Sequence, residues 1–123
     1  MTSQEARRHP AVKIAAELHR YVLASMLDLG GNWRDQLLRS LVSVGANWCE
    51  GHGKRDGGSP AMYPLRISRG EAYESAFLIS LLGDANRDLL DLADRMCDLL
   101  DTELPDEFET KTSSSTLTIT AER

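Results

Sequence analysis

The sequence predicts an all-α domain that folds as an antiparallel, up-and-down four-helix bundle. Apolar residues recur at the spacing of a helix face in four separate segments, each of about 18 residues. Glycine, proline or a capping residue stands between these segments and marks where one helix ends and the next begins. Helices of this length are about 27 Å long, and with short connections they pack as antiparallel neighbours around one core.

The length and composition are those of one globular domain with a tail. The chain has 123 residues, of which 41% are hydrophobic and 27% charged, and both fractions are ordinary for a folded domain. We assign residues 1–104 to the bundle domain. Residues 105–123 are polar and rich in serine and threonine, so we expect a disordered tail. The alternation of Leu117 and Ile119 with threonines leaves a short strand borrowed by a partner as the alternative.

The cysteines and the apolar runs exclude several classes of protein. Cys49 and Cys97 are the two cysteines, far apart and in no paired motif, which argues against a disulfide scaffold or a zinc site and favours a reducing compartment. The amino terminus is too polar for a secretory signal. The longest apolar run, around residues 76–82, is far too short to cross a membrane. We therefore expect a cytoplasmic protein with no membrane association.

The first predicted helix begins at Pro10, since proline is tolerated at the first helical position, and ends before Gly30 and Gly31. Its predicted buried stripe consists of Val12, Ala15, Ala16, His19, Val22, Leu23 and Met26.

The second predicted helix runs from about Trp33 to Glu50 and carries two adjoining apolar stripes. The first stripe consists of Leu37, Leu41, Val44 and Trp48. The second consists of Leu38, Val42 and Cys49. Together they make an apolar face broader than a simple surface helix needs.

The third predicted helix starts at Pro64 and continues to about Leu82. It is apolar on several sides, through Leu65, Ala72, Tyr73, Ala76, Phe77, Leu78, Ile79, Leu81 and Leu82. A helix of this kind is normally buried on several sides, which in a chain this small indicates an oligomer.

The fourth predicted helix, about 85–103, has the clearest amphipathic pattern. Its inward residues are Leu89, Leu92, Ala93, Met96, Leu99, Leu100 and Leu104. Its outward residues are Asp84, Asp88, Asp91, Asp94, Asp98 and Asp101. Pro105 ends it.

Charge is distributed unevenly along the chain, whose net charge is −5. Residues 1–83 hold 10 lysines and arginines against 8 acidic residues, whereas residues 84–109 hold 2 against 10. The pattern predicts a mildly basic body with one strongly acidic helix face. Any surface that binds nucleic acid must therefore come from the first two-thirds of the chain.

No constellation in the sequence fits a catalytic or metal site. The loop after Glu50 contains Gly51, Gly53 and Lys54, but it lacks the spacing and the preceding strand of a phosphate-binding loop. Cys49, Glu50 and His52 are too close together to converge on a metal, and no second cluster supplies further ligands. We expect no catalytic residue, no metal and no cofactor, and hence a protein that acts by binding.

Two glutamates and an arginine are candidates for structural ion pairs. Glu50 and Glu74 each lie on a predicted helix that is apolar nearby, and Arg39 is a candidate partner in the same region. Ion pairs between helices would fix the helix register. A carboxylate pair for acid–base or metal chemistry, and hence a small carboxylate-dependent enzyme, is the alternative.

Five basic residues are candidates for contacts with phosphate. If the second and third helices pack side by side, we expect them to cluster: Arg34, Lys54, Arg55, Arg66 and Arg69. Such clusters position nucleic-acid backbones without reading sequence. Trp33 and Trp48 are large enough to stack on bases, although the helical spacing of Trp48 favours the core.

Two blocks within residues 36–74 carry a more specific pattern. The positions concerned are Gln36, Arg39, Ser43, Asn47, Glu50, Gly51, Arg66, Gly70 and Glu74. They resemble the signature of a small bacterial four-helix-bundle family, which includes proteins encoded in 23S ribosomal RNA intervening sequences and the accessory variability determinants of diversity-generating retroelements. The chain departs from that pattern at Gly45, where the family has proline, at Trp48 and Cys49, where it has small residues, and at Glu71, where it has serine.

The resemblance implies a ring-shaped homo-oligomer, usually a pentamer. For the retroelement members it also implies an accessory protein that binds a reverse transcriptase and its template RNA or DNA during mutagenic copying. A protein of the ribosomal-insert type is one alternative. A protein-only scaffold that docks a basic partner through the acidic fourth helix is the other.

Overall fold

The computed structural model describes residues 1–55 and 57–105, and this part of the chain is helical, with no strand. The elements are α1 (Ser3–Arg7), α2 (Pro10–Ala24), α3 (Trp33–Gly53), α4 (Met62–Ser80), the 3-10 helix η1 (Asp84–Asn86) and α5 (Arg87–Glu103). The all-α part of the predicted fold class is thereby confirmed. The predicted tail, apart from Pro105, lies outside the described residues.

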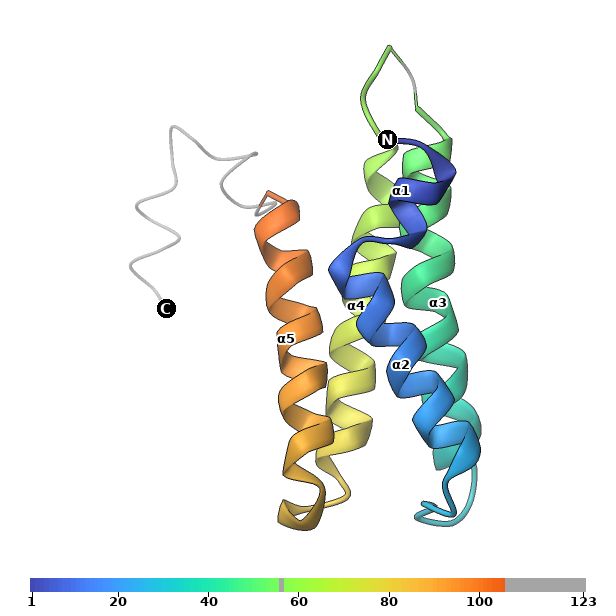
Figure 1. Ribbon diagram of the computed structural model, residues 1–123, viewed down its shortest axis with the longest axis vertical. Coiled ribbons are helices and arrows are strands. Elements are labelled where there is room, and N and C mark those ends of the chain that lie inside the picture. Colours follow the sequence, from blue (N-terminus) through green and yellow to red (C-terminus); the bar gives the residue numbers. More distant parts are fainter. Residues whose placement is uncertain (56, 106–123) are drawn as a thin grey trace, which may run out of the picture.

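The four long helices lie side by side, and α1 lies at the end where α3 turns into α4 (Figure 1). α3 packs against both α2 and α4, and α5 packs against both α4 and α2. α3 and α4 run in opposite directions, because Ser40 contacts Ser75, whereas Val44, later on α3, contacts Ser68, earlier on α4. The core fills the space between these helices.

The predicted buried positions of α3 and α5 are largely confirmed. On α3 the buried stripe consists of Leu37, Leu41, Val44 and Trp48. On α5 and just beyond it, the buried residues include Leu89, Ala93, Met96, Leu100 and Leu104, while the six predicted aspartates are exposed. Val42, from the second predicted stripe of α3, is exposed.

The predicted stripe of α2 is wrong in part. Ala15 and Val22 are buried as expected, but the other buried residues are Ala11 and Leu18. The prediction placed Ala16, Leu23 and Met26 in the core, and all three are exposed. Met26 is 97% exposed because α2 ends at Ala24, before the chain reaches it.

α1 is a short helix that the apolar pattern did not predict, since five residues are too few for periodicity. It begins with a reciprocal capping box: the Glu5 amide donates to Thr2 Oγ1 over 3.1 Å and the Thr2 amide donates to Glu5 Oε1 over 2.8 Å. These hydrogen bonds lower the pKa of Glu5. Ala6 is buried, and α1 packs on α3.

The turn from α3 to α4 depends on Gly51. The Ala61 amide donates to the Gly51 carbonyl over 2.9 Å, which ties the two ends of the loop together. A Cβ at Gly51 would lie 2.5 Å from Leu65 Cδ2 and 3.0 Å from the Ala61 carbonyl oxygen. Glycine is therefore required by this close approach of α4.

No helix among the described residues is long and apolar enough to span a membrane.

Candidate functional site

α1 and the loop between α3 and α4 lie at the same end of the molecule (Figure 1), and both carry basic residues. We call this region the loop end and define it by Arg7, Arg8, Lys54 and Arg55, which are all exposed. Two pKa shifts reflect how close α1 lies to the end of α3. The pKa of Glu5 on α1 is lowered by hydrogen bonds to Thr2 and further by the Arg55 guanidinium. The pKa of Cys49 on α3 is raised by burial, and Arg7 on α1 opposes that rise.

Lys54 and Arg55 each make one local contact. Lys54 Nζ lies 2.8 Å from Glu50 Oε2, one helical turn earlier, and both side chains are well exposed. An exposed pair of this kind contributes little to stability. Arg55 Nε donates to the His52 carbonyl over 2.9 Å. That bond engages Nε and leaves the two Nη groups to make other contacts.

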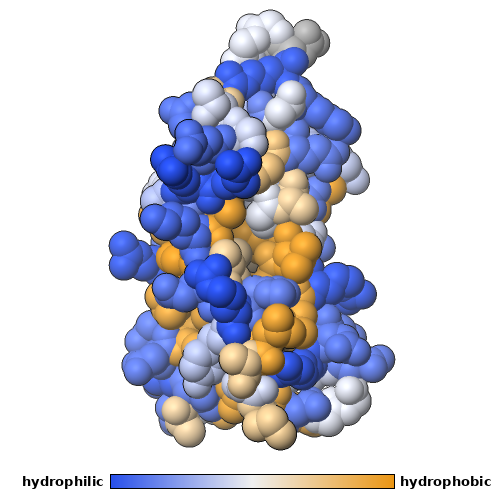
Figure 2. Space-filling model, turned by 45° about the vertical axis from the view of Figure 1, so that its right-hand side comes forward, coloured by the Kyte–Doolittle hydropathy of each residue, from blue (hydrophilic) through white to orange (hydrophobic). Residues whose placement is uncertain are grey.

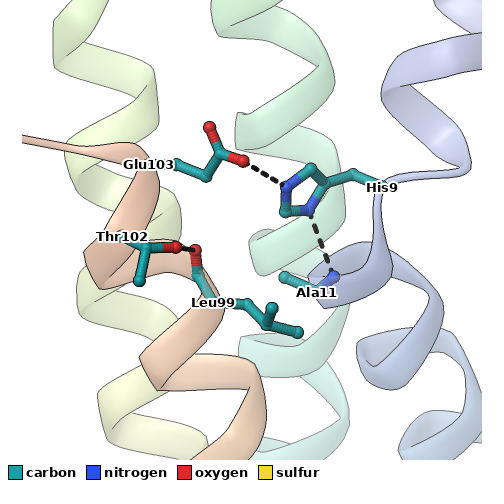
Figure 3. A network of polar contacts seen from close by, with 5 residues as sticks. All are labelled: His9, Ala11, Leu99, Thr102 and Glu103. Carbon is teal, nitrogen blue, oxygen red and sulfur yellow. Dashed lines mark hydrogen bonds and ion pairs between the residues drawn. The ribbon is translucent and has the colours of Figure 1, made fainter.

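His9 connects three helices beneath the loop end (Figure 3). Its Nδ1 accepts from the Ala11 amide over 3.1 Å, which caps α2, and its Nε2 lies 3.1 Å from Glu103 Oε1 at the end of α5. Because Nδ1 is an acceptor, the proton of the neutral ring is on Nε2 and is donated to Glu103. The ring also packs on Trp48 of α3, with 4.5 Å between centroids.

His52 extends this stack toward the surface. Its ring lies 4.5 Å from that of Trp48, and it lines a pocket of about 240 Å³ between α1 and the end of α3, together with Thr2, Ser3 and Cys49. Burial and the neighbouring Arg55 guanidinium lower the pKa of His52. The neutral ring is therefore the form that this environment favours.

Arg34 lies at the opposite end of α3 from the loop end, so the predicted cluster of five basic residues is wrong at this position. It is separated from Lys54 by 20 residues, or about 30 Å of helix. Its guanidinium donates to the carbonyl of Val22, to that of Leu23 over 2.9 Å and to that of Ser25 over 3.2 Å. Arg34 thus caps the carboxyl end of α2, where a cation is favourable.

Arg66 and Arg69 lie on the first half of α4 and are half-buried. Arg66 is one turn into the helix and so close to the loop end. Arg69 is further along, near Tyr73, whose hydroxyl donates to Asp101 Oδ2 over 2.6 Å. This hydrogen bond, with burial, raises the pKa of Tyr73 to about 12, and Arg69 opposes the rise.

Glu50, predicted to form an ion pair between helices, instead pairs with Lys54, one turn later at the end of its own helix. Arg39 and Glu74 are exposed, and their predicted ion pairs stay predictions. Glu74 adjoins Glu71 on α4. Burial raises the pKa of Glu71, Glu74 raises it further, and Arg39 opposes both. Ser43 Oγ donates to Glu71 Oε2 over 3.4 Å.

Asn47 completes this polar contact by donating to Ser43 Oγ over 2.8 Å and to the Ser43 carbonyl over 3.0 Å. Ser43 and Asn47 of α3 thus meet Glu71 of α4 in one polar contact. Arg39 and Glu74 are close enough to shift the pKa of Glu71.

Both tryptophans belong to the core. Trp48 is 1% exposed, and Trp33 is buried with its Nε1 donating to the Leu78 carbonyl over 2.8 Å. Neither presents a ring face to a nucleic-acid base.

The thiols are poorly suited to nucleophilic chemistry, because burial raises the pKa of Cys49 and raises that of Cys97 to about 12. Among the residues with a described placement, no group of three histidine, cysteine or carboxylate side chains is arranged to hold a metal ion.

An apolar groove lies between α2 and α3, on the face turned forward in Figure 2, where apolar residues run between hydrophilic flanks. Its lining includes Val12, Ala16 and Val42, together with the polar side chains of His19 and Arg20. Ala16, which the sequence pattern placed in the core, is exposed in this groove. Val12 also lines the groove but packs, partly buried, against the core.

Arg7 and Arg8 are the site residues that sequence reasoning missed. The capping box from Thr2 to Glu5 is the signal that would have predicted a helix here, with Arg7 in its last turn and Arg8 as its C-cap.

Comparison with protein-family models, with curated proteins and with solved structures finds no match to this chain.

Proposed function

We propose that this protein is a non-enzymatic, nucleic-acid-binding accessory protein of a diversity-generating retroelement, which binds the reverse transcriptase and its template RNA or DNA in the cytoplasm. In this proposal the four long helices form an up-and-down four-helix bundle, and five copies assemble into a ring. The resemblance within residues 36–74 is the reason for naming this class.

The observation that carries the proposal is the loop end. Arg7, Arg8, Lys54 and Arg55 come from two elements and stand exposed within one region of an otherwise acidic protein. Positive groups arranged in this way bind phosphate backbones by releasing counterions, with no need for base contacts. In a ring, each subunit would add one such basic patch. Linked sites bind with higher avidity than one site, so the ring would bind nucleic acid more tightly than one subunit does.

Two apolar surfaces support assembly into an oligomer. One is the groove between α2 and α3 with the exposed Val42. The other is the outer face of α4, where Tyr73, Phe77 and Leu81 are exposed. Gly70 also lies on α4, and a Cβ there would meet nothing within 4 Å. A glycine within a helix costs about 1 kcal/mol relative to alanine, so its presence fits a close approach by a neighbouring subunit.

The proposal is tested by the salt dependence of RNA binding. The double variant Lys54→Glu and Arg55→Glu should bind a structured RNA at least 10-fold more weakly at low salt, and its binding should depend less steeply on salt because phosphate contacts are lost. The matched control is Arg87→Glu with Arg95→Glu, which changes the net charge equally on α5. Equal weakening in both variants would mean that net charge and not the loop end is responsible.

Two further measurements address the partners. Light scattering after gel filtration should give the mass of an oligomer, with five copies expected. A pull-down should show binding to the reverse transcriptase of the same retroelement. A monomer that binds neither RNA nor reverse transcriptase would overturn the proposal.

The acidic face of α5 favours a second candidate, a protein-only scaffold. Asp88, Asp91, Asp94 and Asp98 are all exposed on that helix. Changing the four to asparagine should abolish partner binding if this face docks a basic protein, and should leave it intact if the loop end is the binding surface.

A further inference from the structure

One aromatic side chain stands exposed beside the loop end. Tyr63 is 75% exposed and lies on the first turn of α4, two residues after the loop closes at Ala61. The two tryptophans are buried, and the ring of His9 packs on Trp48 in the interior. Among the described residues, Tyr63 is therefore the aromatic ring that the loop end offers to a flat ligand.

The backbone that carries Tyr63 is held firmly on both sides. Before it, the Ala61 amide is bonded to the Gly51 carbonyl. After it, Pro64 and Leu65 are buried, and Leu65 packs against Gly51. An exposed tyrosine on a fixed backbone has two side-chain torsions to restrict, so it loses little conformational entropy when a ligand covers it.

Basic residues lie in the same region of the fold as this ring. Arg66 is three residues further along the helix, which places the two side chains next to each other on its surface. Lys54 is one turn past Gly51, and the Gly51–Ala61 bond closes the loop between them. Summing these steps along the backbone puts the Cα atoms of Lys54 and Tyr63 within about 20 Å of each other, a span that a few nucleotides can cover.

We propose that the loop end binds single-stranded nucleic acid, with a base stacked on Tyr63 and phosphates a few nucleotides away held by Lys54 and Arg55. This rests on the proposed function and specifies its ligand. A positive surface combined with an aromatic platform is the arrangement that holds single strands with little sequence preference. A duplex keeps its bases stacked on one another, so it can use the phosphate contacts but gains nothing from the ring.

The test compares single and double strands on the full chain. Fluorescence anisotropy would measure binding of labelled oligo-uridylate, of oligo-thymidylate of the same length, and of a duplex of that length. The variants are Tyr63→Ala, Tyr63→Phe, which keeps the ring, and Tyr21→Ala, which removes another exposed tyrosine from α2. Thermal unfolding followed by circular dichroism would verify that each variant folds.

We expect Tyr63→Ala to weaken binding of both single strands about 10-fold, because stacking on one base is lost, and to leave duplex binding within about 2-fold. The slope of affinity against salt should stay the same, since no phosphate contact is removed. Tyr63→Phe and Tyr21→Ala should bind like the wild type. RNA and DNA should respond alike, because stacking does not use the 2′-hydroxyl.

The inference is overturned if Tyr63→Ala binds single strands as the wild type does, or if it loses single strands and duplex equally. In either case the Lys54→Glu, Arg55→Glu variant would still report on the proposed function, because that variant removes phosphate contacts alone. A wild-type protein that binds none of the three probes would overturn both.

Discussion

α4 and α5 are neighbours of similar length, yet they differ in how many of their apolar residues are buried. On α5 the apolar residues face the core and the aspartates face solvent. Packing within one chain is therefore enough to explain the amphipathic pattern of α5. On α4 the core takes Leu65, Ala72 and Ile79, but Phe77 remains 61% exposed, and Tyr73 and Leu81 are exposed with it. α4 therefore has more apolar surface than this chain can bury.

The difference shows how to separate what folds this chain from what it presents to partners. A helix whose apolar residues all face the core of its own chain, as on α5, gives no indication of a partner. A helix with apolar residues on its outer face, as α4 has, exposes surface of the kind that marks contacts with other molecules. Substitutions on each of the two helices can test that separation.

Truncating a core residue of α5 and an outer residue of α4 should have very different effects on folding. Met96 is fully buried, so Met96→Ala should lower the free energy of unfolding by about 2–5 kcal/mol. Phe77→Ala should change that of the dissociated chain by less than about 0.5 kcal/mol, while weakening any oligomer. Urea unfolding of dilute protein and light scattering would measure the two quantities. A large loss of monomer stability in Phe77→Ala would show that this face is already used within the chain.

Two glycines in helices provide a matched pair. Gly51→Ala should destabilise the chain by about 1–3 kcal/mol, because the new Cβ would overlap Leu65 and approach the Ala61 carbonyl. Gly70→Ala should stabilise the isolated chain by up to about 1 kcal/mol, because the space there is open and alanine favours the helix. Thermal unfolding would compare them. A destabilised Gly70→Ala monomer would contradict the view that Gly70 serves a partner.

The sequence was sufficient for the parts of the fold that depend on long periodic patterns. The buried stripe of α3 and the two faces of α5 follow from spacing alone, because those helices are long and face the core on one side. The predicted stripe of α2 is wrong in part, since Ala16 is exposed and lines a surface groove that has the same apolar character as the core. α1 was missed because its evidence is a capping box and not a period.

Residues of the candidate site could be predicted only where their position in a loop makes a side chain exposed. Lys54 and Arg55 follow Gly51 and Gly53 into a loop, so their exposure could be inferred. Arg34 could not be assigned in the same way, because its role depends on the carbonyls that end α2, and those are known only once α2 and α3 are placed side by side. The same holds for Arg7 and Arg8, which join the loop end through the packing of α1 on α3.

The inner face of α4 is joined to α3 partly by buried hydroxyls, whereas α5 is held by alkyl packing. The Ser75 and Ser40 hydroxyls share a hydrogen bond of 2.7 Å, and Ser75 also bonds the Glu71 carbonyl over 2.9 Å. Ser75→Ala should cost about 1 kcal/mol. The control is Ser80→Ala, whose exposed hydroxyl bonds only the Phe77 carbonyl of its own helix, and which should cost less. Equal losses in urea unfolding would argue that the buried hydroxyls do not contribute to this contact.

The smallest expected effect concerns the hydrogen bond that joins α4 to α5 directly. Tyr73 donates to Asp101 Oδ2 over 2.6 Å at an exposed position, so Tyr73→Phe should lower the free energy of unfolding near neutral pH by only about 0.5 kcal/mol. The hydrogen bond and burial raise the pKa of Tyr73 to about 12, from an ordinary value of 10.0. Folding thus favours the protonated phenol, and its stabilisation is complete below pH 10 and is lost as the pH rises from 10 towards 12. Urea unfolding should show that the free energies of unfolding of the wild type and of Tyr73→Phe differ at pH 7 and become similar at pH 11. Tyr63→Phe is the control, and its difference from the wild type should not shrink in this way. A difference that persists unchanged at pH 11 would mean that Tyr73 holds α5 through its ring and not through its hydroxyl.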